Sequence, residues 1–237
     1  MPERETGWKN SVVKTLLVAL LAAVAAAANP NGDEIARKAA AVVTAQRKVH
    51  PRYSFRLVRV RRVVDGNLRS EARYDMRVHM ANESIERIEY FSVTQNDRAL
   101  TATELKQLAQ QADEANKRMP RFRAPYETLA LAEYDFKADG QEKMANHPCY
   151  RIRFRSRRLD AEHGHGLMWV DTHSFNVVKL AYELSSNSAG VRTNRIELYR
   201  APALAELWGL ARMYQKIERG PKSYEESAFD YSDFREP

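Results

Sequence analysis

Hydrophobic and polar residues alternate along most of the chain after residue 52, which is the pattern of half-buried β-strands. Between residues 68 and 80, every second position in the second half of the run is large and apolar. These positions are Tyr74, Met76, Val78 and Met80. Similar runs, rich in aromatic and β-branched residues, predict strands at 53–64, 68–80, 85–93, 129–136, 149–157, 166–170, 177–184, 192–199, 208–217 and 224–234.

Short polar turns connect these runs. Two of the turns, at 65–66 and 139–140, are Asp-Gly pairs, which favour tight hairpins. The strands do not alternate with helices of crossover length, as they would in a parallel sheet. The sequence therefore predicts an α+β fold of nine or ten strands in a mostly antiparallel β-sheet.

The first of two predicted helices occupies residues 33–49. Ile35 and Val42 fall on one face at the 3.6-residue period, with basic residues elsewhere. Asn31 or Asp33 can cap its N-terminus.

The second predicted helix occupies residues 101–118. Thr101 and Glu104 form a capping box, in which each side chain accepts a hydrogen bond from the other residue's backbone N–H. Leu105 begins a narrow apolar stripe, and Pro120 ends the segment.

The N-terminus has the pattern of a secretory signal peptide. Lys9 and Lys14 precede an unbroken apolar run of thirteen residues, 16–28, which ends in small residues. A membrane-spanning helix needs about 20 apolar residues, so the run is short for a span. We expect a signal peptide at 1–28 and a single exported domain at 29–237. A permanent anchor or a buried N-terminal helix is the alternative.

Composition excludes several enzyme classes. The chain has 237 residues, a net charge of +7 and one cysteine, so no internal disulfide can form. The sequence contains no phosphate-binding loop, no G-x-S-x-G elbow and no C-x-x-C pair. Cys149 lies at the start of a strand-like run, where we expect a small buried thiol rather than a reactive one.

Three stretches of the sequence resemble a known family. Residues 166–179 read Gly-Leu-Met-Trp-Val-Asp-Thr-His-Ser-Phe-Asn-Val-Val-Lys, residues 146–154 read Asn-His-Pro-Cys-Tyr-Arg-Ile-Arg-Phe, and residues 231–234 read Tyr-Ser-Asp-Phe. The first resembles the strand–turn–strand signature of the periplasmic lipoprotein-carrier superfamily. The other two look like segments of outer-membrane lipoprotein-sorting proteins. Thr172 stands where the family usually has proline.

The resemblance implies an unclosed half β-barrel whose concave apolar face is covered by helices. It also implies a periplasmic protein that holds lipid or lipoprotein cargo between sheet and helices, with a membrane-bound donor or acceptor protein as a further partner. On this basis we expect six residues to face inward and line an apolar cleft. They are Tyr74, Met76, Met80, Tyr150, Ile152 and Phe154. The alternative is that the same residues form an ordinary packed core.

Arginines alternate with the apolar residues of the run 149–157. Arg151, Arg153 and Arg155 therefore share one face of a strand. Such a stripe could bind anionic headgroups, whereas the export signal argues against nucleic acid. The alternative is a solvated face paired with acidic neighbours such as Glu183 or Glu197.

Histidines are the one enzyme-like feature. Four potential metal ligands fall within eleven residues, namely His163, His165, Asp171 and His173. On a continuous strand His165 and Asp171 would stand about 20 Å apart, too far to share an ion. Asp171 to Ser174 instead reads as a turn in which the aspartate bonds the backbone. We therefore predict neither a metal site nor a cofactor.

The sequence shows no catalytic set of carboxylates or of serine and histidine. Together these features predict a non-enzymatic exported binding protein that holds lipid or lipoprotein cargo, and outer-membrane lipoprotein sorting is a role that such a protein would serve. The alternative is an envelope-stress or regulatory sensor that uses the same cleft to detect lipoproteins and signals to a partner. A hydrolase or metal enzyme would depend on the histidines alone. The oligomeric state is open.

Overall fold

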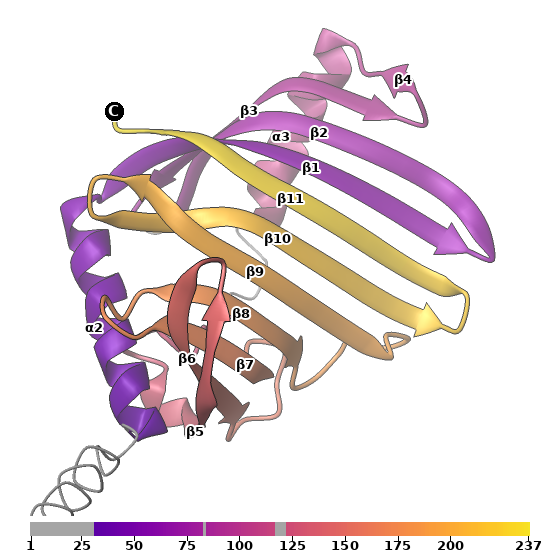
Figure 1. Ribbon diagram of the computed structural model, residues 1–237. Coiled ribbons are helices and arrows are strands. Elements are labelled where there is room, and N and C mark those ends of the chain that lie inside the picture. The colour runs from indigo at the N-terminus through magenta and orange to yellow at the C-terminus, as the bar shows by residue number, and fades with distance from the viewer. Residues whose placement is uncertain (1–30, 83, 117–121) are drawn as a thin grey trace, which may run out of the picture. The chain divides into compact units, whose positions relative to one another are not determined.

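The described part of the chain forms an antiparallel sheet with two helices packed on it (Figure 1). The computed structural model describes residues 31–82, 84–116 and 122–237, so the expected signal peptide at 1–28 lies outside the described residues. The elements are α2 (Gly32–Val49), β1 (Arg52–Asp65), β2 (Asn67–Ala81), β3 (Ser84–Gln95), β4 (Arg98–Ala99), α3 (Ala102–Asn116), β5 (Tyr134–Met144), β6 (His147–Ser156), β7 (Gly164–Asp171), β8 (Val177–Leu184), β9 (Thr193–Leu204), β10 (Leu207–Gly220) and β11 (Ser223–Arg235).

The strand order follows from a simple meander with one long-range pairing. Successive strands form antiparallel neighbours, with the exception of β4 and β5, and β1 also pairs with the last strand, β11. The order is therefore β4, β3, β2, β1, β11, β10, β9, β8, β7, β6, β5. The edge strands β4 and β5 do not pair with each other, so the sheet is an unclosed half-barrel, as predicted.

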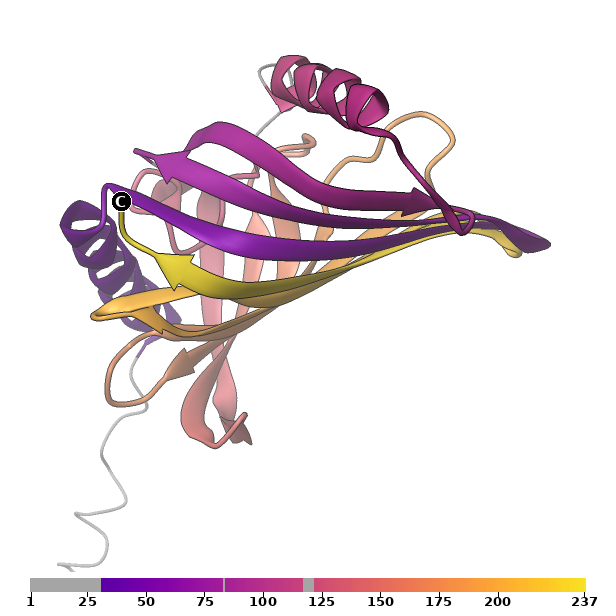
Figure 2. The same cartoon turned by 90° about the horizontal axis from the view of Figure 1, so that it is seen from above.

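The sheet curves around α2, which lies on its concave face (Figure 2). The helix packs on β5, β6 and β10. Neighbouring strands lie about 4.8 Å apart, so β5 and β10 are roughly 24 Å apart along the sheet. An 18-residue helix is about 27 Å long. Its first residue, Gly32, lies against β5, and Gln46 near its end accepts a hydrogen bond from the backbone N–H of Trp208 on β10, so the helix lies across the strands between them.

The sequence predicts the position of α2 correctly but its contact face only in part: Ile35 is buried, whereas Val42 is half-buried and Val43 is buried in its place. The Asn31 side chain caps the helix by accepting a hydrogen bond from the backbone N–H of Asp33. Its buried face consists mostly of small residues, which let the helix approach the sheet closely. They are Gly32, Ile35, Ala36, Ala39, Ala40 and Val43.

The predicted capping box of α3 is also present. The Glu104 carboxylate accepts from the backbone N–H of Thr101 at 2.8 Å, and Thr101 Oγ1 accepts from the backbone N–H of Glu104 at 3.3 Å. The helix packs on β3. The expected end at Pro120 lies outside the described residues. No described helix combines the length and the apolar character that crossing a bilayer requires.

Two predictions around β5 are wrong. The strand expected at 129–136 begins only at Tyr134, because residues 124–133 form turns and a short 3₁₀ helix that pack Ala130 against the core. The expected turn at Asp139-Gly140 is a register irregularity inside β5, where Gly140 has a φ of 105°. The chain instead turns at residues 145–146, both of which have positive φ.

Candidate functional site

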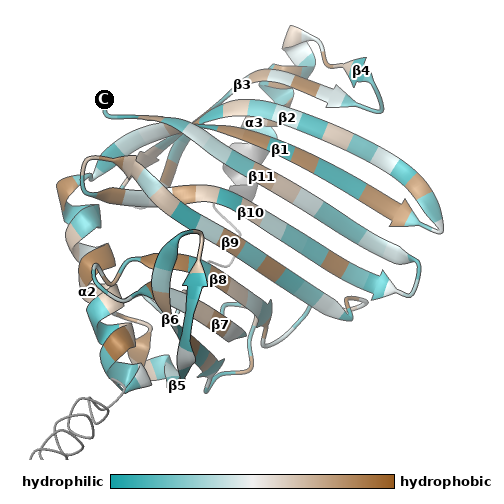
Figure 3. Cartoon of the chain, viewed as in Figure 1, coloured by the Kyte–Doolittle hydropathy of each residue, from teal (hydrophilic) through white to brown (hydrophobic). Residues whose placement is uncertain are grey.

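The concave face runs without interruption across the sheet. Arg59 on β1 pairs with Tyr74 on β2 and with Phe229 on β11. Phe229 pairs with Met213 on β10, and Met213 with Leu198 on β9. Directly paired residues point to the same side of a sheet. These five side chains therefore lie on one surface, and hydrophobic and hydrophilic residues alternate along these strands (Figure 3).

One half of this face is a packed core. We call it the packed cluster: it joins α2 and residues 122–134 to the inner side chains of β6 to β9. Ile152 and Phe154 are 0% and 1% exposed there. Tyr150 lies at its margin and stacks on Phe175 at a ring distance of 6.3 Å. These side chains fill the space between helix and sheet.

The other half of the face is only partly covered. We call it the open cluster, in which three residues are buried, Phe55, Met76 and Val78. The apolar residues around them stay partly exposed, namely Tyr53, Leu57, Tyr74, Met80, Ile88, Tyr90, Tyr231 and Phe234.

Two grooves border the open cluster. One, of about 400 Å³, is lined in part by Tyr231 and Phe234. The other, of about 320 Å³, is lined in part by Tyr53 and Met80. Apolar surface that borders a groove and remains accessible is suited to binding an apolar ligand.

The six residues expected to line one cleft fall into two clusters. Tyr74, Met76 and Met80 belong to the open cluster. Tyr150 borders the packed cluster, to which Ile152 and Phe154 belong. Of the six, Met80 alone lines one of these two grooves.

Sequence reasoning missed the aromatic residues that complete the open cluster. Phe55 on β1 lies 5.5 Å from the rings of both Tyr231 and Phe234 on β11. The alternation in both strands indicates which residues face inward. Nothing local indicates that the first and last strands are neighbours.

Two of the three outer-face arginines already have carboxylate partners on β5. Arg151 contacts Asp139 and Glu142 at 3.4 and 3.3 Å, and Arg153 contacts Asp139 at 2.9 Å. The hydrogen bond from Arg153 is the main cause of a lowered pKa at Asp139. Arg155 is exposed. Binding of anionic headgroups by this stripe stays a prediction.

The acidic partners suggested for that stripe were wrong. Glu183 pairs with Arg195 at 2.8 Å, and Glu197 pairs with Lys179 at 2.8 Å. Glu183 and Glu197 lie on β8 and β9, which are separated from β6 by β7. Asp139 lies on β5, which is the neighbour of β6 on the opposite side.

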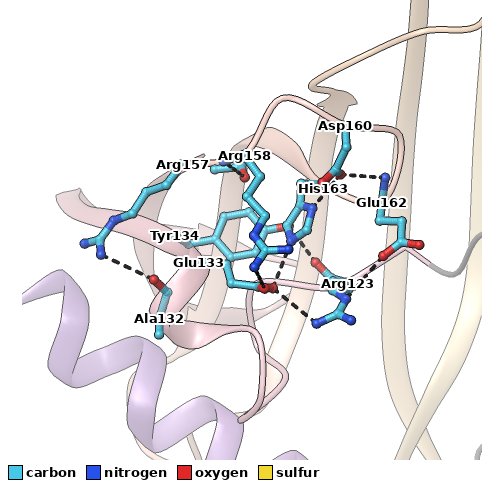
Figure 4. A network of polar contacts seen from close by, with 10 residues as sticks. Arg123, Ala132, Glu133, Tyr134, Arg157, Arg158, Asp160, Glu162 and His163 are labelled. Carbon is cyan, nitrogen blue, oxygen red and sulfur yellow. Dashed lines mark hydrogen bonds and ion pairs between the residues drawn. The ribbon is translucent and has the colours of Figure 1, made fainter.

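His163 is the buried centre of a polar network (Figure 4). The ring is 0% exposed, with Nδ1 at 2.6 Å from Asp160 and Nε2 at 2.9 Å from Glu133. Glu133 also contacts Arg158 at 3.2 Å and Arg123 at 3.5 Å. Burial lowers the pKa of His163, but the two carboxylates outweigh it, and the net shift is upward.

This network anchors the fold rather than catalysing a reaction. A general base must reach its substrate, and both nitrogens of His163 are occupied and shielded from solvent. The network ties the segment before β5 to the loop between β6 and β7. Among the described residues, no group of three or more His, Cys, Asp or Glu side chains is arranged to hold a metal ion.

Asp171 forms the predicted turn. Its carboxylate accepts from the backbone N–H groups of His173 and Ser174 at 3.0 and 2.7 Å. Cys149 is the predicted buried thiol: it is 0% exposed beside Trp169, and burial raises its pKa to about 11. A thiol with so high a pKa is a poor nucleophile.

Comparison with known proteins gives similarity in fold. No family model matches the chain, and no curated protein matches it. The chain is similar to the crystal structure of a LolA superfamily protein from Nitrosomonas europaea, with 12% identity, 88% of this chain and 94% of that one covered, and a TM-score of 0.42. It is also similar to a putative outer membrane lipoprotein-sorting protein domain from Vibrio parahaemolyticus, with 12% identity, coverage of 86% and 92%, and a TM-score of 0.42.

A third similar structure is a DUF1329 family protein from Desulfovibrio piger, with 10% identity, coverage of 84% and 91%, and a TM-score of 0.40. At these identities the likeness concerns the fold alone. Function is therefore argued from this chain's own side chains.

Proposed function

We propose that this protein binds the hydrocarbon chains of a lipid or lipoprotein on its open cluster and catalyses no reaction. The observation that carries the proposal is the contrast between the two halves of one concave face. Around Ile152 the face is filled by α2, whereas around Leu57 and Tyr231 its apolar side chains stay partly exposed beside grooves. A contiguous group of apolar side chains that stays accessible to solvent commonly marks a binding site.

The energetics of such binding are favourable. Each buried CH₂ group contributes about 0.8 kcal/mol, so ten of them contribute roughly 8 kcal/mol before the costs of association. Met76 and Met80 suit such a surface because flexible thioethers adapt to chains of different shape. The aromatic rings of Tyr53 and Phe234 add broad, rigid contact area.

We further propose that the protein acts after export, in the periplasm, as a carrier in the sorting of outer-membrane lipoproteins. The basic and apolar pattern of residues 1–28 supports export. A carrier must release its cargo, so a membrane-bound donor or acceptor would be its second partner. Native mass spectrometry of protein taken from its own cell envelope tests this: a co-purified lipid or lipopeptide mass is expected, and an empty chain would contradict it.

A charge placed on the open cluster tests the binding face. In Leu57→Lys the new ammonium would lie beside Met76 and Tyr231, the residues with which Leu57 pairs. We expect at least a tenfold loss of affinity for the neutral fluorescent probe N-phenyl-1-naphthylamine, because burying an ammonium costs more than about 1.4 kcal/mol.

Val58→Lys is the matched control. Val58 is the next residue on the same strand, points to the opposite face, and pairs with Asp75 and Asp230. This variant should bind the probe like the unsubstituted protein. Equal loss in both variants, or in neither, would contradict binding on the concave face.

A further inference from the structure

Arg59 is a cation within the open cluster. Its guanidinium lies over the rings of Tyr74 and Phe229, at 5.7 and 5.0 Å from their centres. These are the residues that flank it on β2 and β11. Contact with two rings keeps the guanidinium close to the concave face.

Arg59 has no carboxylate partner among the described residues. Nη2 donates one hydrogen bond, to Ser227 Oγ at 3.2 Å. Nε is buried and has no acceptor in the described part of the chain. The nearby Glu225 carboxylate already binds Arg61 through both oxygens, at 2.7 and 2.9 Å. Burial accordingly lowers the pKa of Arg59.

The other arginines of this part of β1 are paired. Arg56 binds Asp75 through two hydrogen bonds of 2.8 and 2.6 Å, and Arg62 binds Glu71 at 2.6 Å. A buried donor without an acceptor destabilises a fold, and a ligand that supplies the acceptor would remove this cost. The fork of a guanidinium matches a carboxylate or a phosphate.

The inner face of β1 is long enough to hold a chain attached to such an anion. Arg59, Leu57, Phe55 and Tyr53 are alternate residues of β1, so they follow one another along its inner face. At about 3.4 Å per residue, Tyr53 lies roughly 20 Å from Arg59. A lipid chain that spans half of a bilayer core is about 15 Å long.

We propose that Arg59 binds the anionic head, carboxylate or phosphate, of an amphiphile whose hydrocarbon chain lies on the open cluster. This inference rests on the proposed function and names its ligand class. The protein should therefore prefer an anionic amphiphile to a neutral one of equal chain length.

Displacement of N-phenyl-1-naphthylamine by dodecanoate and by dodecanol tests the preference. We expect dodecanoate to displace the probe at a concentration about tenfold lower, since a charge-assisted hydrogen bond is worth at least one factor of ten. Arg59→Gln should abolish this difference and leave displacement by dodecanol unchanged. The control Arg56→Gln, on the opposite face of the same strand, should keep it.

The outcomes separate the two proposals. If both amphiphiles displace the probe equally, or if Arg59→Gln keeps the preference, the role of Arg59 is overturned while the proposed function stands. If neither amphiphile nor the probe binds, both fail. If inorganic phosphate alone competes as well as dodecanoate, the site binds a free anion, and the amphiphile proposal is overturned.

The melting temperature of the empty protein gives a second readout. Removing an unpaired buried cation should not destabilise the fold, so Arg59→Met should melt at the same temperature as the unsubstituted protein or higher. Arg59→Met can also replace Arg59→Gln in the displacement experiment. A marked drop in melting temperature for both variants would indicate a structural arginine and overturn the inference.

Discussion

At the scale of single residues, His163 shows how geometry sets protonation. Each ring nitrogen faces a carboxylate oxygen, from Asp160 at 2.6 Å and from Glu133 at 2.9 Å. Ionised carboxylates only accept hydrogen bonds, so both nitrogens must carry protons and the ring is an imidazolium. The pKa of His163 is raised, and those of both carboxylates are lowered, with the hydrogen bond to His163 as the main cause.

The raised pKa of His163 predicts pH-dependent stability. A group whose pKa is raised by folding stabilises the folded state fully at pH values below its unfolded pKa, which is about 6.5 for histidine. This stabilisation is lost as the pH rises through the folded pKa. His163→Gln should therefore lower the free energy of unfolding by about 2 kcal/mol at pH 6 and by less at pH 9. Urea unfolding at the two pH values measures this.

His165→Gln is the control for this experiment, since His165 lies only two residues after His163, at the start of β7, and is exposed. It should change stability little at either pH. Both carboxylates stay ionised from pH 6 to 9, so they add no pH dependence of their own. An equal loss at both pH values for His163→Gln would show that its charge does not stabilise the fold.

At the scale of elements, the closeness of α2 to β5 depends on one missing side chain. A Cβ on Gly32 would lie 2.9 Å from the backbone nitrogen of Ala138 and 3.0 Å from backbone atoms of Lys137. Those atoms belong to a paired strand and cannot move aside singly. The start of the helix is therefore fixed on the sheet by contact between backbones.

Gly32→Ala should consequently destabilise the protein, although alanine is ordinarily the better helix residue by about 1 kcal/mol. We expect a loss of about 1–3 kcal/mol from overpacking, measured by thermal or urea unfolding. Gly220→Ala is the control, since a Cβ there would meet only Ser223 Cβ, at 3.8 Å. A gain in stability for Gly32→Ala would contradict the close packing.

At the scale of the whole sheet, the pairing of β1 with β11 creates the open cluster. It places Phe55 and Leu57 beside Tyr231 and Phe234, although the two pairs lie near opposite ends of the described sequence. The packed cluster at the other end of the sheet is closed by α2. One continuous surface thus combines a rigid, filled half with an accessible half.

Hydrogen exchange with a bound ligand tests this division. Saturating dodecanoate should slow amide exchange in peptides from 53–64 and 74–80, which carry the open cluster, and leave 149–157 unchanged. Protection confined to 149–157 would mean that Tyr150, Ile152 and Phe154 line the ligand site. That outcome would contradict binding on the open cluster.

The local parts of this architecture could be predicted from the sequence alone. Alternation assigned the inner side chains of β2, and the capping pair Thr101 and Glu104 marked the start of α3, because both signals arise between residues a few positions apart. The Asp139-Gly140 pair was wrongly predicted to be a turn, because a turn and a β-bulge both require a residue that tolerates positive φ. Only the pairing of β5 with β6 shows that the pair forms a bulge.

Tertiary structure alone decided which inward-facing residues meet and which stay accessible. Arg59 and Arg61 are equivalent in the alternation of β1, yet Glu225 binds Arg61 and leaves Arg59 without a carboxylate. Likewise Met80 and Ile152 are both inward apolar residues, but α2 covers only the part of the face that holds Ile152. The ion-pair partner of an arginine and the helix that covers an apolar residue come from distant segments of the chain. No local sequence pattern therefore encodes them.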